Sequence, residues 1–130
     1  MAARQDKWPV LLGWINVGLG IALVLAYWIY LPAPARFMAG GNPDPGLILY
    51  ALATAGSAFV AWGLMLRGIS ASGVSRGLVF KSAAAGFALL GFMRLGTALF
   101  PHAPFDQMLA LPVIECVVFA VVAVLFFRAS

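Results

Sequence analysis

Residues 117–122 have the sequence Val-Val-Phe-Ala-Val-Val, a run without a polar side chain. A strand of a membrane β-barrel alternates polar and apolar residues over about 10 positions, so this run favours a helix. It lies in the last of four apolar segments, each close to the roughly 20 residues that a helix needs to cross a bilayer. The sequence therefore predicts an all-α membrane protein whose transmembrane helices span about residues 8–31, 46–67, 78–100 and 106–128.

Composition and length indicate a single integral membrane domain over residues 1–130. Of these residues 64% are hydrophobic and 9% are charged, whereas about 25% of the residues are charged in soluble domains. The link between the third and fourth helices, residues 102–106, is short enough to bring the fourth helix back beside the third. We therefore expect four antiparallel transmembrane helices in a bundle.

The charged residues predict how the helices are oriented. The net charge is +4, but the cations occur singly between apolar segments, which argues against a nucleic-acid-binding patch. Lys and Arg gather near both chain ends and around the connection 68–77, which is the pattern of cytoplasmic segments. These residues are Arg4, Lys7, Arg67, Arg76, Lys81 and Arg128. We expect both chain ends inside (N-in, C-in), in the plasma (inner) membrane of a bacterium.

A secretory signal peptide is the alternative interpretation of the N-terminal segment. Ala33-Pro34-Ala35 has the small residues of a cleavage site, but the apolar stretch before it exceeds the roughly 7–15 residues of a signal peptide. We therefore expect this segment to remain as a spanning helix.

The sequence also predicts where helices begin and which of their faces pack together. Asp6 and Asp44 are expected N-caps, and Pro45 suits the first position of the second helix. Pro112 either kinks the fourth helix or is its first residue. Stripes of small residues predict close helix packing, because helices in lipid gain little from burying apolar surface. The stripes are Gly18, Ala22 and Ala26; Ala53, Ser57 and Ala61; and Ala84, Ala88 and Gly91.

Arg94 and Glu115 are ionisable residues inside predicted spanning helices, where a central Arg or Asp costs about 2.5–3.5 kcal/mol to insert. Counted from the outer ends of their helices, Arg94 lies about 9 Å deep and Glu115 about 12 Å deep. Because the two helices are expected neighbours, we predict a charge-assisted hydrogen bond between these residues. Such a pair either pins the helices together or lines a polar cavity that opens outward.

Further polar side chains are candidates for the same site. Thr97 lies one turn from Arg94, Asn16 is a lone amide suited to bridging helices, and His102 stands in the link before the fourth helix. Tyr50, Thr54 and Ser57 share a face of the second helix. The candidate binding residues are therefore Arg94, Glu115, Thr97, Asn16 and His102.

The remaining reactive residues argue against an enzyme or a metal site. His102 and Asp106 are four residues apart, as a base and its orienting acid can be, but no Ser or Cys nucleophile is expected nearby. One His and the single Cys116 cannot supply a zinc site by themselves. These residues do not identify a cofactor.

Four features extend over most of the chain. Residues 42–46 open the second helix as Asn-Pro-Asp-Pro-Gly, Gly91 and Arg94 form a Gly-x-x-Arg motif, a short link with Pro follows, and Glu115 lies in the fourth helix. In these features the chain resembles a family of small bacterial four-helix membrane proteins known only as a domain of unknown function. The resemblance implies the four-helix fold and leaves the activity unassigned.

The sequence thus predicts a non-enzymatic membrane protein that contacts the lipid bilayer and no nucleic acid. The leading hypothesis is an accessory or scaffold subunit of a larger membrane complex, or a small-ligand binder. The alternative is a small proton-coupled transporter, in which Glu115 takes up and releases a proton as substrate binds. A transporter is expected to act as a homo-oligomer, because four short helices enclose little volume.

Overall fold

The computed structural model describes residues 7–36, 44–69, 73–102 and 104–130. Four long helices form this part of the chain, with two short 3-10 turns in the connections. They are α1 (Lys7–Tyr30), η1 (Pro34–Arg36), α2 (Pro45–Arg67), α3 (Arg76–Leu99), η2 (Phe105–Gln107) and α4 (Ala110–Ala129). The four predicted helices are therefore present, and the expected cap Asp6 lies outside the described residues.

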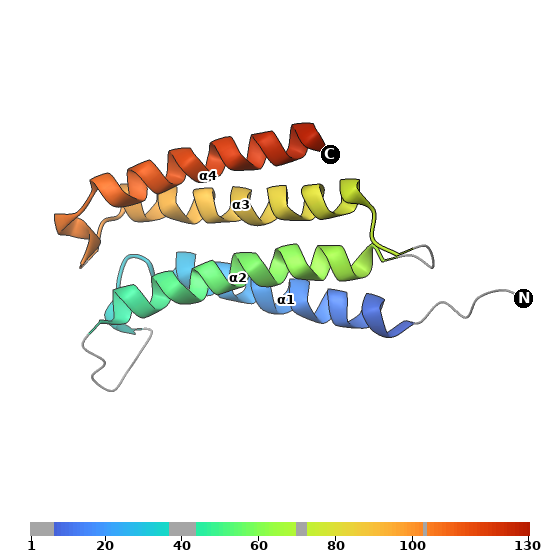
Figure 1. Ribbon diagram of the computed structural model, residues 1–130. Coiled ribbons are helices and arrows are strands. Elements are labelled where there is room, and N and C mark those ends of the chain that lie inside the picture. The colour runs from blue at the N-terminus through green and yellow to red at the C-terminus, as the bar shows by residue number, and fades with distance from the viewer. Residues whose placement is uncertain (1–6, 37–43, 70–72, 103) are drawn as a thin grey trace, which may run out of the picture.

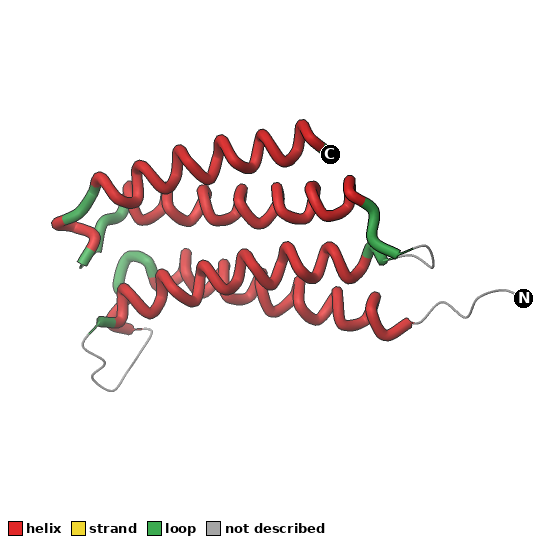
Figure 2. The backbone as a smooth tube through the Cα atoms, in the orientation of Figure 1, coloured by secondary structure: helices red, strands yellow, loops and turns green. Residues whose placement is uncertain are grey.

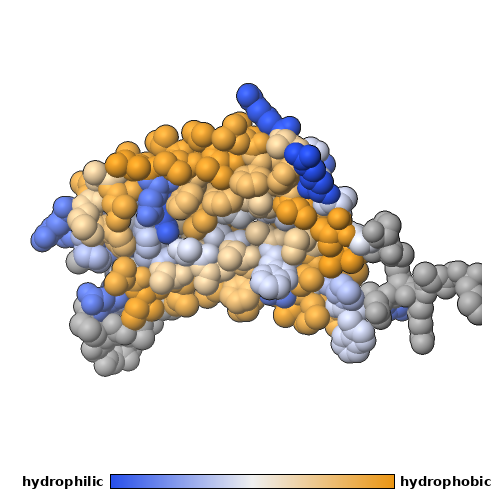
Figure 3. Space-filling view, viewed as in Figure 1, coloured by the Kyte–Doolittle hydropathy of each residue, from blue (hydrophilic) through white to orange (hydrophobic). Residues whose placement is uncertain are grey.

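All four long helices have the length and apolar composition of membrane spans. Many of their large apolar side chains are exposed, most of all on α4, where only Pro112 and Ala123 are buried. The face of the molecule in Figure 3 is accordingly coloured as hydrophobic over most of its area, with hydrophilic residues mainly toward the two ends. Such a surface suits a lipid environment, because soluble proteins rarely expose large contiguous apolar patches.

The helices are arranged as two pairs (Figures 1 and 2). Helix α1 packs along α2, helix α3 packs along α4, and a smaller contact between α2 and α3 joins the two pairs. The starts of α1 and α3 and the ends of α2 and α4 lie at one end of the molecule. Helix α4 is thus an outer helix that packs mainly against α3.

Glycines bring α1 and α2 into close contact. A Cβ atom on Gly20 would lie 2.5 Å from the carbonyl oxygen of Gly56, and a Cβ on Gly63 would lie 2.6 Å from that of Gly13. Any larger residue would therefore collide with the backbone of the other helix. The predicted contact stripe of α1 is wrong, because Gly18 and Ala22 are exposed and a Cβ on Gly18 would meet nothing within 4 Å.

The other two stripes are correct in part. On α2, Ala53 and Ser57 are buried as expected. On α3, Ala84 and Gly91 are buried but Ala88 is exposed. Gly91 faces α4 and not α2, because a Cβ atom there would lie 3.5 Å from backbone atoms of Cys116 and Ala120. The stripe residues are thus mostly buried, but they do not form one shared contact between α2 and α3.

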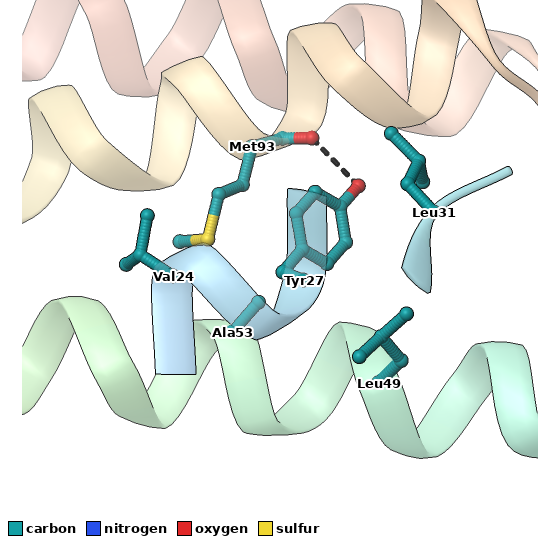
Figure 4. Packing of buried hydrophobic residues seen from close by; sticks show 6 residues of the cluster. All are labelled: Val24, Tyr27, Leu31, Leu49, Ala53 and Met93. Atoms are coloured by element: carbon teal, nitrogen blue, oxygen red, sulfur yellow. Dashed lines mark hydrogen bonds between the residues drawn. The ribbon is translucent and has the colours of Figure 1, made fainter. Parts of the chain in front are cut away.

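A compact core joins α1, α2 and α3 on the side where α2 begins (Figure 4). Its buried members are Val24, Tyr27, Leu31, Leu49, Ala53 and Met93. Tyr27 is fully buried, and its hydroxyl group donates a hydrogen bond to the carbonyl oxygen of Met93 over 2.8 Å. This bond crosses from α1 to α3, so it ties the first helix pair to the second.

Two helix starts differ from expectation. Pro45 is the first residue of α2, but the side chain of Asp44 makes no capping hydrogen bond. Helix α4 begins at Ala110 and not near residue 106, because residues 105–107 form the separate turn η2. Pro112 is therefore neither a kink nor the first residue. It occupies the first turn of α4, where its missing N–H group would have no partner within the helix.

Candidate functional site

Arg94 is the centre of a polar cluster inside the helical part of the molecule. Arg94 is only 4% exposed. Its Nε atom donates a hydrogen bond to Oε2 of Glu115 over 2.5 Å. The structure thus brings together the two residues that the sequence pointed to, one from α3 and one from α4. A charged group buried in this way is tolerated when a partner of opposite charge meets it.

Helix α2 completes the cluster with two residues one turn apart. The Nη2 atom of Arg94 donates to the hydroxyl oxygen of Thr54 over 2.9 Å. The hydroxyl group of Tyr50 donates to the same Glu115 oxygen that Arg94 uses. The Tyr50 ring also lies beneath the guanidinium group, 3.3 Å from ring centre to Cζ, which is a cation–π contact. Three helices therefore hold one ion pair.

The local helix geometry explains this convergence. Tyr50 and Thr54 are four residues apart, so both side chains project from the same face of α2. Glu115 lies in the second turn of α4, beyond the first turn that Pro112 occupies. The carboxylate thereby reaches the level of Arg94 on the neighbouring helix α3.

One hydrogen-bond donor of the cluster is unused. The Nη1 atom of Arg94 is buried and has no hydrogen-bond partner in the described part of the chain. Guanidinium groups only donate hydrogen bonds, and leaving a buried donor unpaired costs about 1–3 kcal/mol, with more for a charged group. The cluster is therefore incomplete, because the two N–H groups of Nη1 have no acceptor among the described residues.

An aromatic chain extends the cluster toward the link between α3 and α4. The ring of Phe105 stacks on Tyr50 with 4.2 Å between the ring centres. His102 contacts Phe105 edge-on at 5.5 Å. His102 is thus connected to the cluster through the rings of Phe105 and Tyr50. Phe105 could not be predicted as part of the site, because an aromatic residue in a short loop is not distinctive.

The remaining predicted site residues lie elsewhere. Thr97 is fully buried and shares a hydrogen bond with the hydroxyl group of Tyr27, so it belongs to the contact between α1 and α3. The amide of Asn16 donates to the carbonyl oxygen of Leu12 over 2.8 Å, within its own helix. This hydrogen bond of Asn16 therefore lies within α1, and the bridge to another helix stays a prediction.

A groove of about 410 Å³ runs between α2 and α3. One end of it contains Thr54, the residue that accepts the hydrogen bond from Arg94. The other lining residues are largely apolar or small. Gly86 and Ala61 lie close together across the two helices, because a Cβ on Gly86 would lie 2.9 Å from that of Ala61. The lining residues are Thr54, Ser57, Ala58, Ala61, Trp62, Met65, Val79, Ser82, Ala83, Gly86, Phe87 and Leu90.

Comparisons with protein-family models, with curated proteins and with solved structures give no match to this chain. The chemistry of the site therefore has to be inferred from its geometry. That geometry combines a buried ion pair, an unused donor and an adjoining groove.

Proposed function

We propose that this chain is a non-enzymatic bacterial plasma-membrane protein that binds a small ligand at the Arg94–Glu115 cluster. The four helices cross the bilayer in alternating directions, and both chain ends lie in the cytoplasm. The ligand supplies the hydrogen-bond acceptor that Nη1 of Arg94 lacks. An accessory role in a larger membrane complex is compatible with this activity, because α4 leaves most of its apolar surface exposed.

The unused Nη1 donor is the observation that supports this proposal best. If the ion pair only joined helices, the unpaired Nη1 atom of Arg94 would cost free energy without any gain. The bilayer interior has no water that could accept its hydrogen bonds. Ionisable residues within membrane spans generally mark binding or transport sites. Binding sites in proteins commonly have volumes of about 300–1,000 Å³, and the neighbouring groove falls in this range.

Co-purification tests the proposal. The protein is extracted in mild detergent, and mass spectrometry identifies the small molecules and proteins that remain bound. The decisive variant carries Arg94→Met together with Glu115→Leu, which removes the donors without leaving a stranded charge. We expect this variant to fold and to lose the bound small molecule.

The matched control carries Arg128→Met together with Asp106→Leu. Both of these residues are exposed, and the change in formal charge is the same. We expect the control to retain the ligand at the level of the unmodified protein. Equal ligand content in the two double variants would contradict a binding role of the cluster.

Reporter fusions test the proposed orientation, which rests on the distribution of Lys and Arg. A cytoplasmic reporter fused after Ser130 is expected to be active, whereas the same reporter inserted near Gly40 is expected to be inactive. The opposite pattern would overturn the proposed topology. A mature protein that begins at Arg36 would overturn the first spanning helix.

A proton-coupled transporter is the second candidate, and the exposure of Glu115 supports it. The side chain of Glu115 is 28% exposed, whereas that of Arg94 is 5% exposed. The carboxylate can therefore meet a proton or substrate from outside the cluster. In proteoliposomes, a transporter would acidify the lumen on substrate addition, and Glu115→Gln would abolish this signal. An unchanged signal in the variant would exclude Glu115 as the proton carrier.

A further inference from the structure

The groove between α2 and α3 is as long as one leaflet of a bilayer is deep. Its lining runs from Thr54 to Met65 on α2 and from Val79 to Leu90 on α3. Each of these ranges rises about 16 Å at about 1.5 Å per residue. The hydrocarbon core of a bilayer is about 30 Å thick, so one leaflet contributes about 15 Å. The groove therefore has the length that the acyl chains of a single leaflet cover.

Acyl chains are the material that fills this groove in a bilayer. Small residues of both helices line it, among them Ala58 and Ala61 on α2 and Ala83 and Gly86 on α3. The bilayer core holds no water that could enter, and an empty apolar gap would lose van der Waals contacts. We therefore expect a neighbouring lipid to occupy the groove, and the residues at the groove's end determine which head group it carries.

Arg76 stands at the end of the groove that lies nearest to the start of α3. It is the first residue of α3, and the lining residues Val79 and Ala83 follow it three and seven positions later, on the same face of the helix. Its guanidinium group lies over the ring of Phe80, 5.0 Å from the ring centre to Cζ, and thus turns along α3. Arg76 is exposed. Its planar group of donors suits phosphate oxygens, which Arg binds through paired hydrogen bonds.

Positive side chains surround this end of the molecule. The starts of α1 and α3 and the ends of α2 and α4 lie together there (Figure 1). Their Lys and Arg residues are Lys7, Arg67, Arg76, Lys81 and Arg128. The acidic residues of the described ranges, Asp44, Asp106 and Glu115, lie beside the start of α2, before α4 and in the second turn of α4, toward the other end. Arg4 and Asp6 cancel in formal charge. The charge around Arg76 therefore favours an anionic head group over a zwitterionic one.

From these observations we propose that the groove between α2 and α3 binds an anionic phospholipid. An acyl chain lies between the two helices, and the phosphate group accepts hydrogen bonds from Arg76. Under the proposed topology the lipid belongs to the cytoplasmic leaflet. Its head group lies at the opposite end of the groove from Thr54, which contacts the Arg94–Glu115 cluster. The inference therefore goes beyond ligand binding at that cluster and does not depend on it.

Two lipids with the same acyl chains test the head group. Palmitoyl-oleoyl phosphatidylglycerol is anionic, whereas palmitoyl-oleoyl phosphatidylcholine is zwitterionic. Native mass spectrometry of the delipidated protein measures the binding of each lipid in about 0.15 M ammonium acetate, where exposed charges more than about 8 Å apart are largely screened. We expect phosphatidylglycerol to bind at least about fivefold more tightly, which is the gain that one basic residue near a membrane surface gives. Equal binding of the two lipids would contradict the proposal.

Two variants of α3 test whether Arg76 holds the head group. Arg76→Gln removes the positive charge beside the groove. Lys81→Gln removes the same charge from an exposed residue that lies about 140° around the helix from Arg76. We expect Arg76→Gln to lower the preference for phosphatidylglycerol about fivefold and Lys81→Gln to leave it within about twofold. An equal loss in both variants would show a general attraction of anions and would overturn a site at Arg76.

A second pair of variants tests the position of the acyl chain. Ala83→Phe places a ring in the groove, whereas Ala88→Phe adds the same side chain at an exposed position of α3 outside the lining. We expect Ala83→Phe to weaken binding of phosphatidylglycerol at least about tenfold, the loss expected when about two methylene groups leave an apolar contact. Ala88→Phe is expected to leave binding unchanged, and equal effects would contradict the groove as the site. Melting temperatures without lipid check that both variants fold, and Arg76→Gln tests the same site without altering the packing.

The variant with Arg94→Met and Glu115→Leu separates this inference from the proposed function. It retains Arg76 and every residue that lines the groove. We expect it to bind phosphatidylglycerol as the unmodified protein does, even though it is expected to lose the small ligand of the cluster. Loss of phosphatidylglycerol from this variant would place the lipid at the cluster and overturn the site at Arg76.

Discussion

Helix α2 packs against its two neighbours in different ways. Toward α1 it presents Gly56 and Gly63, and the two backbones approach so closely that no Cβ atom fits between them. Toward α3 it presents polar side chains at one end and a groove at the other. Helices in lipid associate through close packing or through hydrogen bonds, and this molecule uses the first for α1–α2 and relies on the second for α2–α3. Only the second contact leaves room for a ligand.

Removal of Glu115 is expected to have the largest effect on the polar cluster, in which this residue of α4 accepts hydrogen bonds from Tyr50 of α2 and Arg94 of α3. Glu115→Ala leaves the buried guanidinium group of Arg94 without its counter-charge, and breaking a buried ion pair costs about 3–5 kcal/mol. Arg94→Ala is expected to cost less, because a stranded carboxylate can bind a proton whereas a guanidinium group cannot lose one. Unfolding of both variants in detergent measures the difference. An equal or larger loss for Arg94→Ala would contradict this asymmetry.

A methyl group at the glycine contact is expected to have the next largest effect. Gly20→Ala places a Cβ atom against the Gly56 backbone, and overpacking of this kind costs about 1–3 kcal/mol. Gly18→Ala is the matched control on the same helix, since its Cβ would meet nothing within 4 Å. If thermal stability in detergent falls equally for both variants, the close contact between α1 and α2 does not exist.

The hydroxyl group of Tyr27 tests the smallest of these effects. Tyr27→Phe removes the hydrogen bonds to Met93 and Thr97 that connect α1 to α3, and we expect a loss of about 0.5–1.5 kcal/mol. Ser130→Ala removes an exposed hydroxyl group that bonds only within its own helix end. Its effect is expected to stay within about 0.5 kcal/mol. A loss no larger for Tyr27→Phe than for Ser130→Ala would show that this bond does not stabilise the fold.

The sequence predicted the helices well, because their lengths follow from continuous apolar runs. It failed at the start of α4, where Phe105 and its neighbours form a turn of their own. It also chose the wrong face of α1. Residues seven apart lie on one face of a helix, about two turns from each other. This spacing relates Gly13 to Gly20 on α1 and Gly56 to Gly63 on α2. A search for this spacing would have found the contact that stripes of small residues four apart missed.

The candidate site was also predicted only in part. The pairing of Arg94 with Glu115 could be predicted from their similar depths in neighbouring helices. A charged side chain inside a spanning helix is costly unless it meets a partner. The groove could not be predicted, since it depends on how the side chains of α2 and α3 fit together in three dimensions. The bond from Asn16 to Leu12 could not be predicted from spacing in lipid, because an amide can donate either to its own helix or to a neighbouring one.

A double-mutant cycle on Arg94 and Glu115 tests most directly whether an ion pair between α3 and α4 forms the centre of the polar cluster. The free energy of unfolding is measured for the unmodified protein, Arg94→Ala, Glu115→Ala and the double variant. Because the double variant leaves no stranded charge, we predict a loss smaller than the sum of the two single losses, with a coupling of about 0.5–3 kcal/mol. Additive losses would contradict the pair, and with it the ion pair on which Tyr50 and Thr54 of α2 converge.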